Sequence, residues 1–359
     1  MDIQQELTII KRQIDAGIDE VCEEMISQTK KQDEKMAKVL TYLRTMILAG
    51  GKRARPALVL YGYRAAGGKD PEKIMPAAIG IELIHASLLI HDDIMDRDDK
   101  RHGVSAMHAY YAQHANEAFG LDLDDAQATH FGISTGIDVG IYCYALGIEL
   151  ISEMEMEPQL IVKTISRIQK TIRQTGLGQF QDIIMSHLDN VSEKEVLSMY
   201  QNKTARYSFE NPLQVGAILA GRDNAFCAQL SSYALPLGIA FQMQDDILGI
   251  YGDSQKTGKS VGSDIAEGKQ TYLVVKARAA ANDVQKQKLD GLLGKQDITQ
   301  AQVNDFRTIL DEIGVSEQVQ EEMNNHLNAS TQALESIIMD AQAKEFLSAL
   351  VMYQKSRNH

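Results

Sequence analysis

The 359-residue sequence contains no tryptophan, only six prolines and only three cysteines. Few prolines leave long stretches in which a helix can continue, because proline removes a backbone donor and breaks helices. The cysteines, Cys22, Cys143 and Cys227, are far apart and form no CxxC pair. An odd and sparse set of cysteines is typical of reduced thiols, so we expect a cytoplasmic protein.

The chain also lacks an excess of positive charge, since its formal net charge is −13. A strongly acidic surface repels phosphate, which argues against a generic nucleic-acid or anionic-membrane binder. Any phosphate site must therefore be local and built from a few placed cations or metal ions. Residues 1–21 carry charge throughout and resemble no signal peptide, and no uncharged apolar run reaches the length of a membrane span. We expect no integral membrane segment.

Apolar residues follow helical spacing through most of the chain, and no segment shows the two-residue alternation of a strand. Residues 1–48 suggest two amphipathic helices, and Pro56 suits the first turn of the next one. The sequence predicts an all-α fold with a single domain over residues 1–359. The further segments that we expect are helices near 77–94, 130–153, 159–186, 194–219 and 233–251, a polar loop or short helix at 111–128, a loop at 252–268, and polar helices thereafter.

Paired aspartates lie at the ends of two long apolar helices, Asp92 and Asp93 with Asp96 in the first and Asp245 and Asp246 in the second. On a helix, side chains four residues apart share one face and are separated by roughly 6 Å along the axis. Like charges at that spacing repel unless a cation lies between them. Oxygen-only ligands with room for water suit Mg²⁺ bridged to substrate phosphates. One such group is equally compatible with a solvated helix end, whereas two groups favour a metal site.

Basic residues accompany both acidic groups. Lys52 and Arg55 stand at a glycine-preceded helix start, where backbone N–H groups also favour an anion. Lys203 lies within a predicted helix, Lys259 in the long loop and Lys269 just after it. Each alone could be an ordinary surface cation. Together with the aspartates they indicate a diphosphate site.

Five segments in order resemble motifs of the trans-isoprenyl diphosphate synthases, the polyprenyl synthetase family. They are GGKRARP, ELIHASLLIHDDIMDRDDKRHG, GQFQD, KTA and FQMQDDILGIYGDSQKTGKSVGSDIAEGK. The resemblance implies a prenyl transferase that condenses isopentenyl diphosphate with an allylic diphosphate. It also implies Mg²⁺, a homodimer, and a bundle of about ten or more helices around a central substrate cavity.

The resemblance assigns side chains to each part of that reaction. Those that would hold the diphosphate of isopentenyl diphosphate are Lys52, Arg55 and His85. Those that would ligate Mg²⁺ are Asp92, Asp96 and Asp245, with Asp93 and Asp246 as supporting acids. Those that would contact the allylic diphosphate are Arg101, Lys203 and Lys269, with Lys259 nearby. Those that would line the reacting centre are Thr204, Gln179 and Gln242.

Two positions depart from the family pattern. His102 stands where the family usually has the second arginine of Arg-Arg-Gly, and Gly249 stands where many members have a third aspartate. Histidine lacks the guanidinium fork and titrates near neutral pH. We therefore expect His102 to give weaker and pH-dependent binding of isopentenyl diphosphate, and Gly249 leaves the third ligand of the second acidic group in question.

Product length in such enzymes depends on the side chains that block the tunnel below the first aspartates. The small Ser87 lies five residues before Asp92, Leu88 follows it, and Ile84 lies about one turn deeper. The absence of an aromatic residue there predicts a product of geranylgeranyl length or longer.

Two other interpretations stay open. A terpene cyclase would share the helical fold and the first aspartates, but it would lack the GGKxxR segment. A non-catalytic subunit of a heteromeric synthase would explain His102 and Gly249 as signs of decay, although the retained aspartates, Lys52 and Arg55 argue against it.

Overall fold

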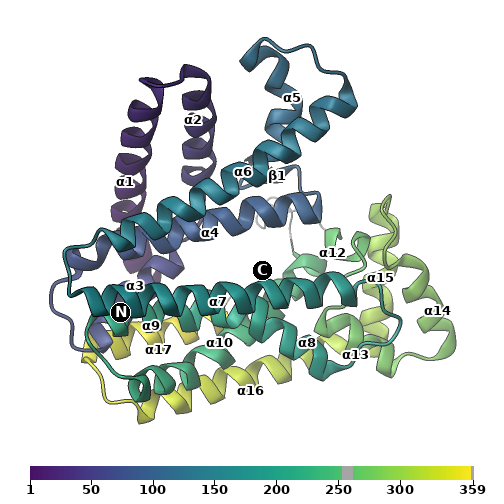
Figure 1. The fold of residues 1–359 in the computed structure, drawn as a ribbon. Helices are drawn as coiled ribbons and strands as arrows, with labels where there is room; N and C mark the ends of the chain where they lie inside the picture. Colours follow the sequence, from purple (N-terminus) through teal and green to yellow (C-terminus); the bar gives the residue numbers. More distant parts are fainter. Residues whose placement is uncertain (253–261, 357–359) are drawn as a thin grey trace. The chain divides into compact units, whose positions relative to one another are not determined.

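The computed structural model describes residues 1–252 and 262–356. Nearly all of this part of the chain is helical (Figure 1), which confirms the predicted all-α fold. Two compact units are present. The N-terminal unit comprises Asp2–Leu60 and Asp70–Ile165, and the C-terminal unit comprises Met1, Tyr61–Lys69 and Ser166–His359. The single domain predicted for residues 1–359 stays a prediction.

The N-terminal unit begins with the two amphipathic helices that the apolar spacing predicted, α1 (Ile3–Lys30) and α2 (Glu34–Leu48). They form an antiparallel pair (Figure 1). Each starts at an aspartate N-cap, Asp2 or Asp33, whose carboxylate accepts hydrogen bonds from backbone N–H groups of the first turn. The loop after α2 leads into α3 (Ala54–Ala65), with Pro56 in its first turn as expected.

The core of this unit is the contact between α4 (Met75–Asp96) and α6 (Asp125–Ser152), which lie side by side (Figure 1). The two backbones meet at glycines. A Cβ atom on Gly80 would lie 2.5 Å from the Gly147 carbonyl oxygen, and one on Gly147 would lie 2.6 Å from that of Gly80. Only glycine permits this approach. The end of α4 that carries the first aspartates is thus supported by a closely packed helix.

A short hairpin interrupts the helices, in a stretch where the sequence shows no alternation of apolar and polar residues. It pairs β1 (Lys100–Arg101) with β2 (Val104–Ser105). His102 (φ 52°) and Gly103 (φ 83°) form its left-handed turn. Strands of two residues are too short to produce an alternating pattern in the sequence.

The polar stretch at 111–128 is mostly helical. Helix α5 (Met107–Phe119) ends at Gly120, and α6 starts at Asp125 after a capping box on Asp124. The connection between these helices is therefore shorter than the stretch that sequence polarity marked out. A 3₁₀ turn (η1, Pro71–Ile74) precedes α4.

The C-terminal unit contains a continuous run where a helix at 194–219 was expected. It consists of α8 (Glu193–Tyr200), the π-helix η2 (Gln201–Glu210) and α9 (Asn211–Leu219). The long helix α7 (Pro158–Met185) precedes it and starts within the N-terminal unit. The segment with Lys203 and Thr204 therefore has the wider π geometry, which is common at functional sites.

Helix α10 (Asn224–Tyr251) begins earlier than the predicted start near Tyr233. The carboxylate of Asp223 caps it by accepting from the Phe226 amide, and the helix continues through Pro236. It lies beside α16 (Val315–Ser336) (Figure 1). The remaining helices are α12 (Ser263–Ala266), α13 (Tyr272–Ala280), α14 (Asp283–Leu292), α15 (Gln300–Ile313) and α17 (Ala341–Ser356).

Two stretches, Pro71–Asp96 and Asp125–Ser152, are long and apolar enough to cross a membrane by length and composition alone. Core helices of soluble proteins pass the same test, and 67% of the most apolar window of the first stretch is buried within the protein, against 39% for the second. This is weak evidence for a span, and the prediction of no integral membrane segment stays a prediction.

Candidate active site

The loop between α2 and α3 is fixed by the buried side chain of Arg53, which is 5% exposed. Its guanidinium donates three hydrogen bonds, to Asp15 of α1 (2.7 Å), to Glu82 of α4 (2.8 Å) and to the Ile47 carbonyl of α2 (2.6 Å). Arg53 itself has a left-handed backbone (φ 51°). Three helices therefore hold the loop that presents Lys52 to solvent.

Arg55 and His85 are brought together, as the sequence predicted. Nη1 of Arg55 lies 2.9 Å from Nε2 of His85. Burial and the positive charge of Arg55 lower the pKa of His85 well below its usual value of 6.5. The imidazole is therefore neutral at neutral pH, and its Nε2 accepts the hydrogen bond that Arg55 donates. An anion placed here would meet a guanidinium whose orientation is already set.

The ring of His102 packs on the glycine that opens the same loop. A Cβ atom on Gly50 would lie 2.5 Å from Cγ of His102. Burial lowers the pKa of His102, and the charges of Arg101 and Arg53 lower it further. The hairpin thus adds a third nitrogen group beside the loop of Lys52, at the position where the sequence departs from the family.

Asp93 holds Arg101 rather than pointing to solvent. Arg101 donates from Nε to Asp93 Oδ1 (2.8 Å) and also from Nη2, which in turn lies 3.3 Å from Asp98. Burial raises the pKa of Asp93 to about 6, although the hydrogen bonds from Arg101 oppose this shift. The left-handed Arg97 (φ 59°) ends α4 and turns the chain so that Arg101 can return to Asp93.

Asp92 and Asp96 are half-buried in the last turns of α4, four residues apart. Their spacing puts both carboxylates on one face of the helix. Oxygen donors that remain accessible to water fit a Mg²⁺ ion, which keeps several waters and binds substrate phosphate. Within residues 1–252 and 262–356, no group of three His, Cys, Asp or Glu side chains is placed to hold a metal ion. A metal ion on this pair would also bind water and diphosphate oxygens.

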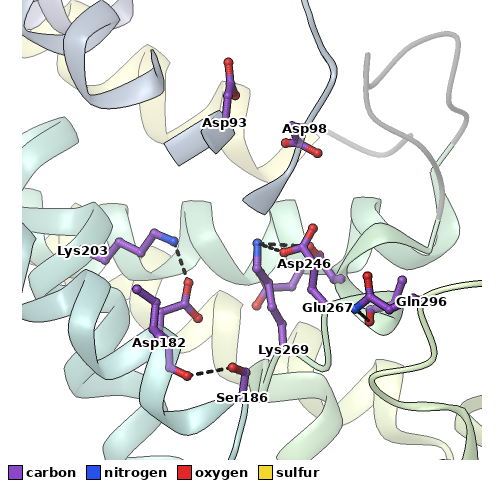
Figure 2. A network of polar contacts seen from close by, with 12 residues as sticks. Asp93, Asp98, Asp182, Ser186, Lys203, Asp246, Glu267, Lys269 and Gln296 are labelled. Atoms are coloured by element: carbon purple, nitrogen blue, oxygen red, sulfur yellow. Dashed lines mark hydrogen bonds and ion pairs between the residues drawn. The ribbon is translucent and has the colours of Figure 1, made fainter. Parts of the chain in front are cut away.

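In the C-terminal unit, Lys203 points at Asp182 of α7, with Nζ 2.6 Å from Oδ2 (Figure 2). The backbones meet here as well, because a Cβ atom on Gly178 would lie 2.4 Å from the Lys203 amide nitrogen. Gln179 follows this glycine and is half-buried. The GQFQD and KTA segments, far apart in sequence, therefore form one contact.

Thr204, Gln242 and Asp246 form a chain of hydrogen bonds. The Thr204 hydroxyl donates to Oε1 of Gln242 (2.7 Å), whose Nε2 donates to Oδ1 of Asp246 (2.9 Å). Asp246 also accepts from the hydroxyl of Tyr200. Burial raises the pKa of Asp246 well above its usual range, and the negative charge of Asp264 adds to this, whereas the hydrogen bonds from Tyr200 and Gln242 oppose it.

The place of the missing third aspartate is taken by a residue from a different element. A Cβ atom on Gly249 would lie 2.6 Å from Oδ2 of Asp264, at the start of α12. A carboxylate is therefore present beside this part of α10 although Gly249 has no side chain. Asp245, one turn before Gly249, is half-buried.

Lys269 lies just after α12, and its Nζ is 2.7 Å from Glu267 and 3.9 Å from Asp264 (Figure 2). Its predicted contact with the allylic diphosphate stays a prediction. Lys259, the other predicted cation of this loop, lies outside the described residues.

The candidate chain-length residues are buried to different degrees. Ser87 is 1% exposed and Ile84 is fully buried, whereas Leu88 is half-buried. Ile84 packs on α6, because a Cβ atom on Gly147 would lie 2.8 Å from its Cγ1. Their role in product length stays a prediction.

Comparison with known proteins decides the family. The profile of the polyprenyl synthetase family matches residues 33–313. This chain belongs to the polyprenyl synthetase family. It is 30% identical to a geranylgeranyl diphosphate synthase of Methanosarcina mazei over 100% of this chain and 99% of the relative. It is 32% identical to a geranylgeranyl pyrophosphate synthase of Geoglobus acetivorans over 88% of this chain and 90% of the relative.

A solved polyprenyl synthetase structure agrees with the fold. The geranylgeranyl pyrophosphate synthase of Corynebacterium glutamicum, in complex with isoprenyl diphosphate and magnesium, superposes with a TM-score of 0.88 at 26% identity. The match covers 96% of this chain and 99% of that one. The chain is thus a prenyltransferase of the isoprenyl diphosphate synthase type.

Sequence reasoning missed four residues of this polyprenyl synthetase site. Arg53 and Asp182 lie inside the GGKRARP and GQFQD motifs. As charged residues within motifs, both could have been proposed as site residues. Asp264 follows Gly262-Ser263 in the long loop, where an acidic residue could have been noted. Tyr200 gave no signal, because a tyrosine in an amphipathic helix is most often a core residue.

Proposed function

We propose that this polyprenyl synthetase condenses isopentenyl diphosphate with an allylic diphosphate and releases an all-trans prenyl diphosphate of geranylgeranyl length or longer. The observation that carries the proposal is the contact of Arg55 with a neutral His85 beside a loop held by Arg53. The names of the relatives support the substrates. The small Ser87 supports a product longer than farnesyl diphosphate.

The isopentenyl diphosphate would bind at the loop after α2. Lys52 and Arg55 supply positive charge, and His85 orients Arg55 through the 2.9 Å contact. His102 adds charge when it is protonated. Because Arg53 fixes the loop, these groups lose little freedom when the diphosphate binds, which favours affinity.

The allylic diphosphate would bind with Mg²⁺ held by Asp92, Asp96 and Asp245. Bound Mg²⁺ neutralises the charge that develops on the leaving diphosphate. The cations that share this role are Arg101, Lys203 and Lys269, with Lys259. Asp93 keeps Arg101 in place, and Asp182 does the same for Lys203. Asp246 supports Gln242 from behind.

The reaction begins when the allylic C–O bond ionises to diphosphate and a resonance-stabilised cation. Thr204, Gln179 and Gln242 would line the centre where the alkene of isopentenyl diphosphate attacks this cation. This attack forms the new carbon–carbon bond. The condensed product then loses a proton to the departing diphosphate. Apolar side chains near the aspartates exclude water, which protects the cation from hydrolysis.

Exposed apolar residues support a homodimer. On α6, Ile137 is 45% exposed and Ile141 58% exposed. On α7, Leu177 is 57% exposed and Phe180 65% exposed. A second copy of the chain would remove such surface from water. We also place the enzyme in the cytoplasm, which suits its buried, unpaired cysteines.

The test is an assay of the purified chain alone with isopentenyl diphosphate, an allylic primer and Mg²⁺, with products resolved by chain length. We expect linear prenyl diphosphates of geranylgeranyl length or longer, and no product after EDTA treatment. Farnesyl diphosphate as the sole end product would refute the proposed length. Cyclic hydrocarbons would indicate a terpene cyclase, and activity only after adding a second protein would indicate a modulating subunit.

A further inference from the structure

We propose that the hydroxyl of Tyr200 is a positioning group for prenyl transfer, which acts through Asp246 and Gln242 to orient the hydroxyl of Thr204. This inference rests on the proposed place of Thr204 and Gln242 at the reacting centre. Tyr200 lies at the last residue of α8 and is 1% exposed. It is not among the residues that we propose to contact a substrate, so its effect on the reaction would be indirect.

The Tyr200 hydroxyl joins three helices within the C-terminal unit. It donates to Oδ2 of Asp246 on α10 and accepts from the backbone amide of Tyr272, the first residue of α13, at 2.7 Å. One buried oxygen therefore connects α8, α10 and α13. Removal of this oxygen would leave a buried backbone N–H and a buried carboxylate oxygen each short of one partner.

The hydrogen bonds of this chain converge on Asp246, which accepts from Tyr200 on one side and from Gln242 on the other. The Tyr272 amide can only donate, so the Tyr200 oxygen accepts from it and sends its own proton to Asp246. The other oxygen of Asp246 accepts from the amide nitrogen of Gln242. The amide oxygen of Gln242 therefore faces Thr204 and accepts its hydroxyl proton.

This order determines what Thr204 presents to a substrate. With its proton committed to Gln242, the Thr204 oxygen offers lone pairs to its surroundings. Lone pairs stabilise positive charge, whereas a hydroxyl proton would oppose it. An allylic cation formed beside Thr204 would meet a dipole that is already correctly oriented, and preorganised dipoles lower the barrier of a charge-forming step.

Burial keeps the Tyr200 hydroxyl protonated, so it remains a hydrogen-bond donor. Burial raises the pKa of Tyr200 well above its usual value of 10.0, and the nearby charge of Asp246 raises it further. Tyr200 therefore stays protonated at every working pH and remains a donor to Asp246. The π-helix η2, which carries Lys203 and Thr204, begins at the residue after Tyr200. A fixed Tyr200 thus also fixes the entry of that helix.

The test compares Tyr200→Phe with Tyr233→Phe in steady-state kinetics with both substrates. Tyr233 is a matched control, because it is a fully buried tyrosine of the same unit whose hydroxyl donates only to the Leu347 carbonyl (2.9 Å). We expect Tyr200→Phe to lower kcat about 10-fold or more, because mutation of a residue that supports a directly acting group typically has an effect of this size. The KM for isopentenyl diphosphate should stay unchanged. Tyr233→Phe should lower the melting temperature but leave kcat unchanged.

A double-variant cycle shows whether Tyr200 acts through Thr204. In a Thr204→Val background, Tyr200→Phe should cause no further loss of kcat, since the oriented hydroxyl is already gone. Equal losses of kcat in both backgrounds would overturn the inference. So would equal kcat values for Tyr200→Phe and Tyr233→Phe.

If Tyr200→Phe fails to fold, Gln242→Met breaks the same chain one link later and must give the same loss of kcat. Wild-type kcat for Gln242→Met would then overturn the inference. The wild-type chain is assayed first. No prenyl product from it overturns the proposed function and this inference with it, whereas an active wild type with an unaffected Tyr200→Phe overturns the inference alone.

Discussion

Replacement of Arg53 by methionine removes the cation that holds the loop of Lys52 and Arg55. Arg53 and its partner Glu82 are 5% and 4% exposed, so the substitution leaves a buried carboxylate without its charge partner. Asp15, the other partner, keeps an ion pair with Lys11 at 2.5 Å and is more exposed. The energetic cost therefore concentrates on Glu82.

The free energy of unfolding should fall by about 3–5 kcal/mol, which is the range for removing one partner of a buried ion pair. Arg44→Met is the matched control, because Arg44 also binds two carboxylates, Asp19 (2.6 Å) and Glu23 (3.1 Å), but at the surface. Its loss should stay below about 1 kcal/mol. Adding Glu82→Gln to Arg53→Met removes the stranded charge and should restore about 2 kcal/mol.

The assay is urea unfolding followed by far-ultraviolet circular dichroism, with the midpoint compared among the four proteins. Arg53→Met should also raise the KM for isopentenyl diphosphate, because Lys52 and Arg55 lose their fixed positions. Equal midpoints for Arg53→Met and Arg44→Met would refute the reasoning. A double variant less stable than Arg53→Met would refute the account of Glu82.

Three further substitutions test other parts of the site. His102→Arg should flatten the pH dependence of the KM for isopentenyl diphosphate. In the wild type this KM should rise with pH, because the pKa of free His102 is below 6.5 and diphosphate binding requires uptake of a proton; the same rise in the variant would contradict this. Ser87→Phe should shorten the product in chromatography, at a stability cost of about 1–3 kcal/mol for overpacking a buried position; an unchanged product would count against the chain-length role. Gly249→Asp should raise the Mg²⁺ concentration needed for half-maximal turnover, because the new Cβ would lie 2.6 Å from the Asp264 carboxylate. Adding Asp264→Gly should restore the wild-type Mg²⁺ requirement, and no recovery would show that Asp264 does not stand in for the third aspartate.

Most helices could be predicted because helical periodicity is a local property. The spacing of Leu7, Ile10, Ile14 and Ile18 determines which face of α1 is buried, and the structure confirms it. The start of α10 was missed because residues 224–232 are mixed in polarity and its cap, Asp223, acts through one backbone amide. The hairpin at His102 was missed because its strands are too short to alternate.

The sequence motifs predict which residues belong to the site, but not how these residues pair with one another. Arg55 and His85 were expected together and lie 2.9 Å apart. Which acid holds which cation is decided by contacts between distant segments, such as Lys203 with Asp182, and no local pattern encodes it. The approach of Asp264 to Gly249 is of the same kind, since it depends on where the chain returns after α10.

The central claim is that Asp92, Asp96 and Asp245 serve the Mg²⁺-assisted ionisation of the allylic diphosphate. The direct measurement is turnover against Mg²⁺ concentration for Asp92→Asn, Asp96→Asn and Asp245→Asn. Asp305→Asn, at an exposed position of α15, controls for the loss of one negative charge. We predict that each of the three substitutions lowers turnover about 100-fold or more, because removal of one group that stabilises the developing charge typically has an effect of this size. Asp305→Asn should leave turnover unchanged. Wild-type turnover in Asp245→Asn would contradict the claim.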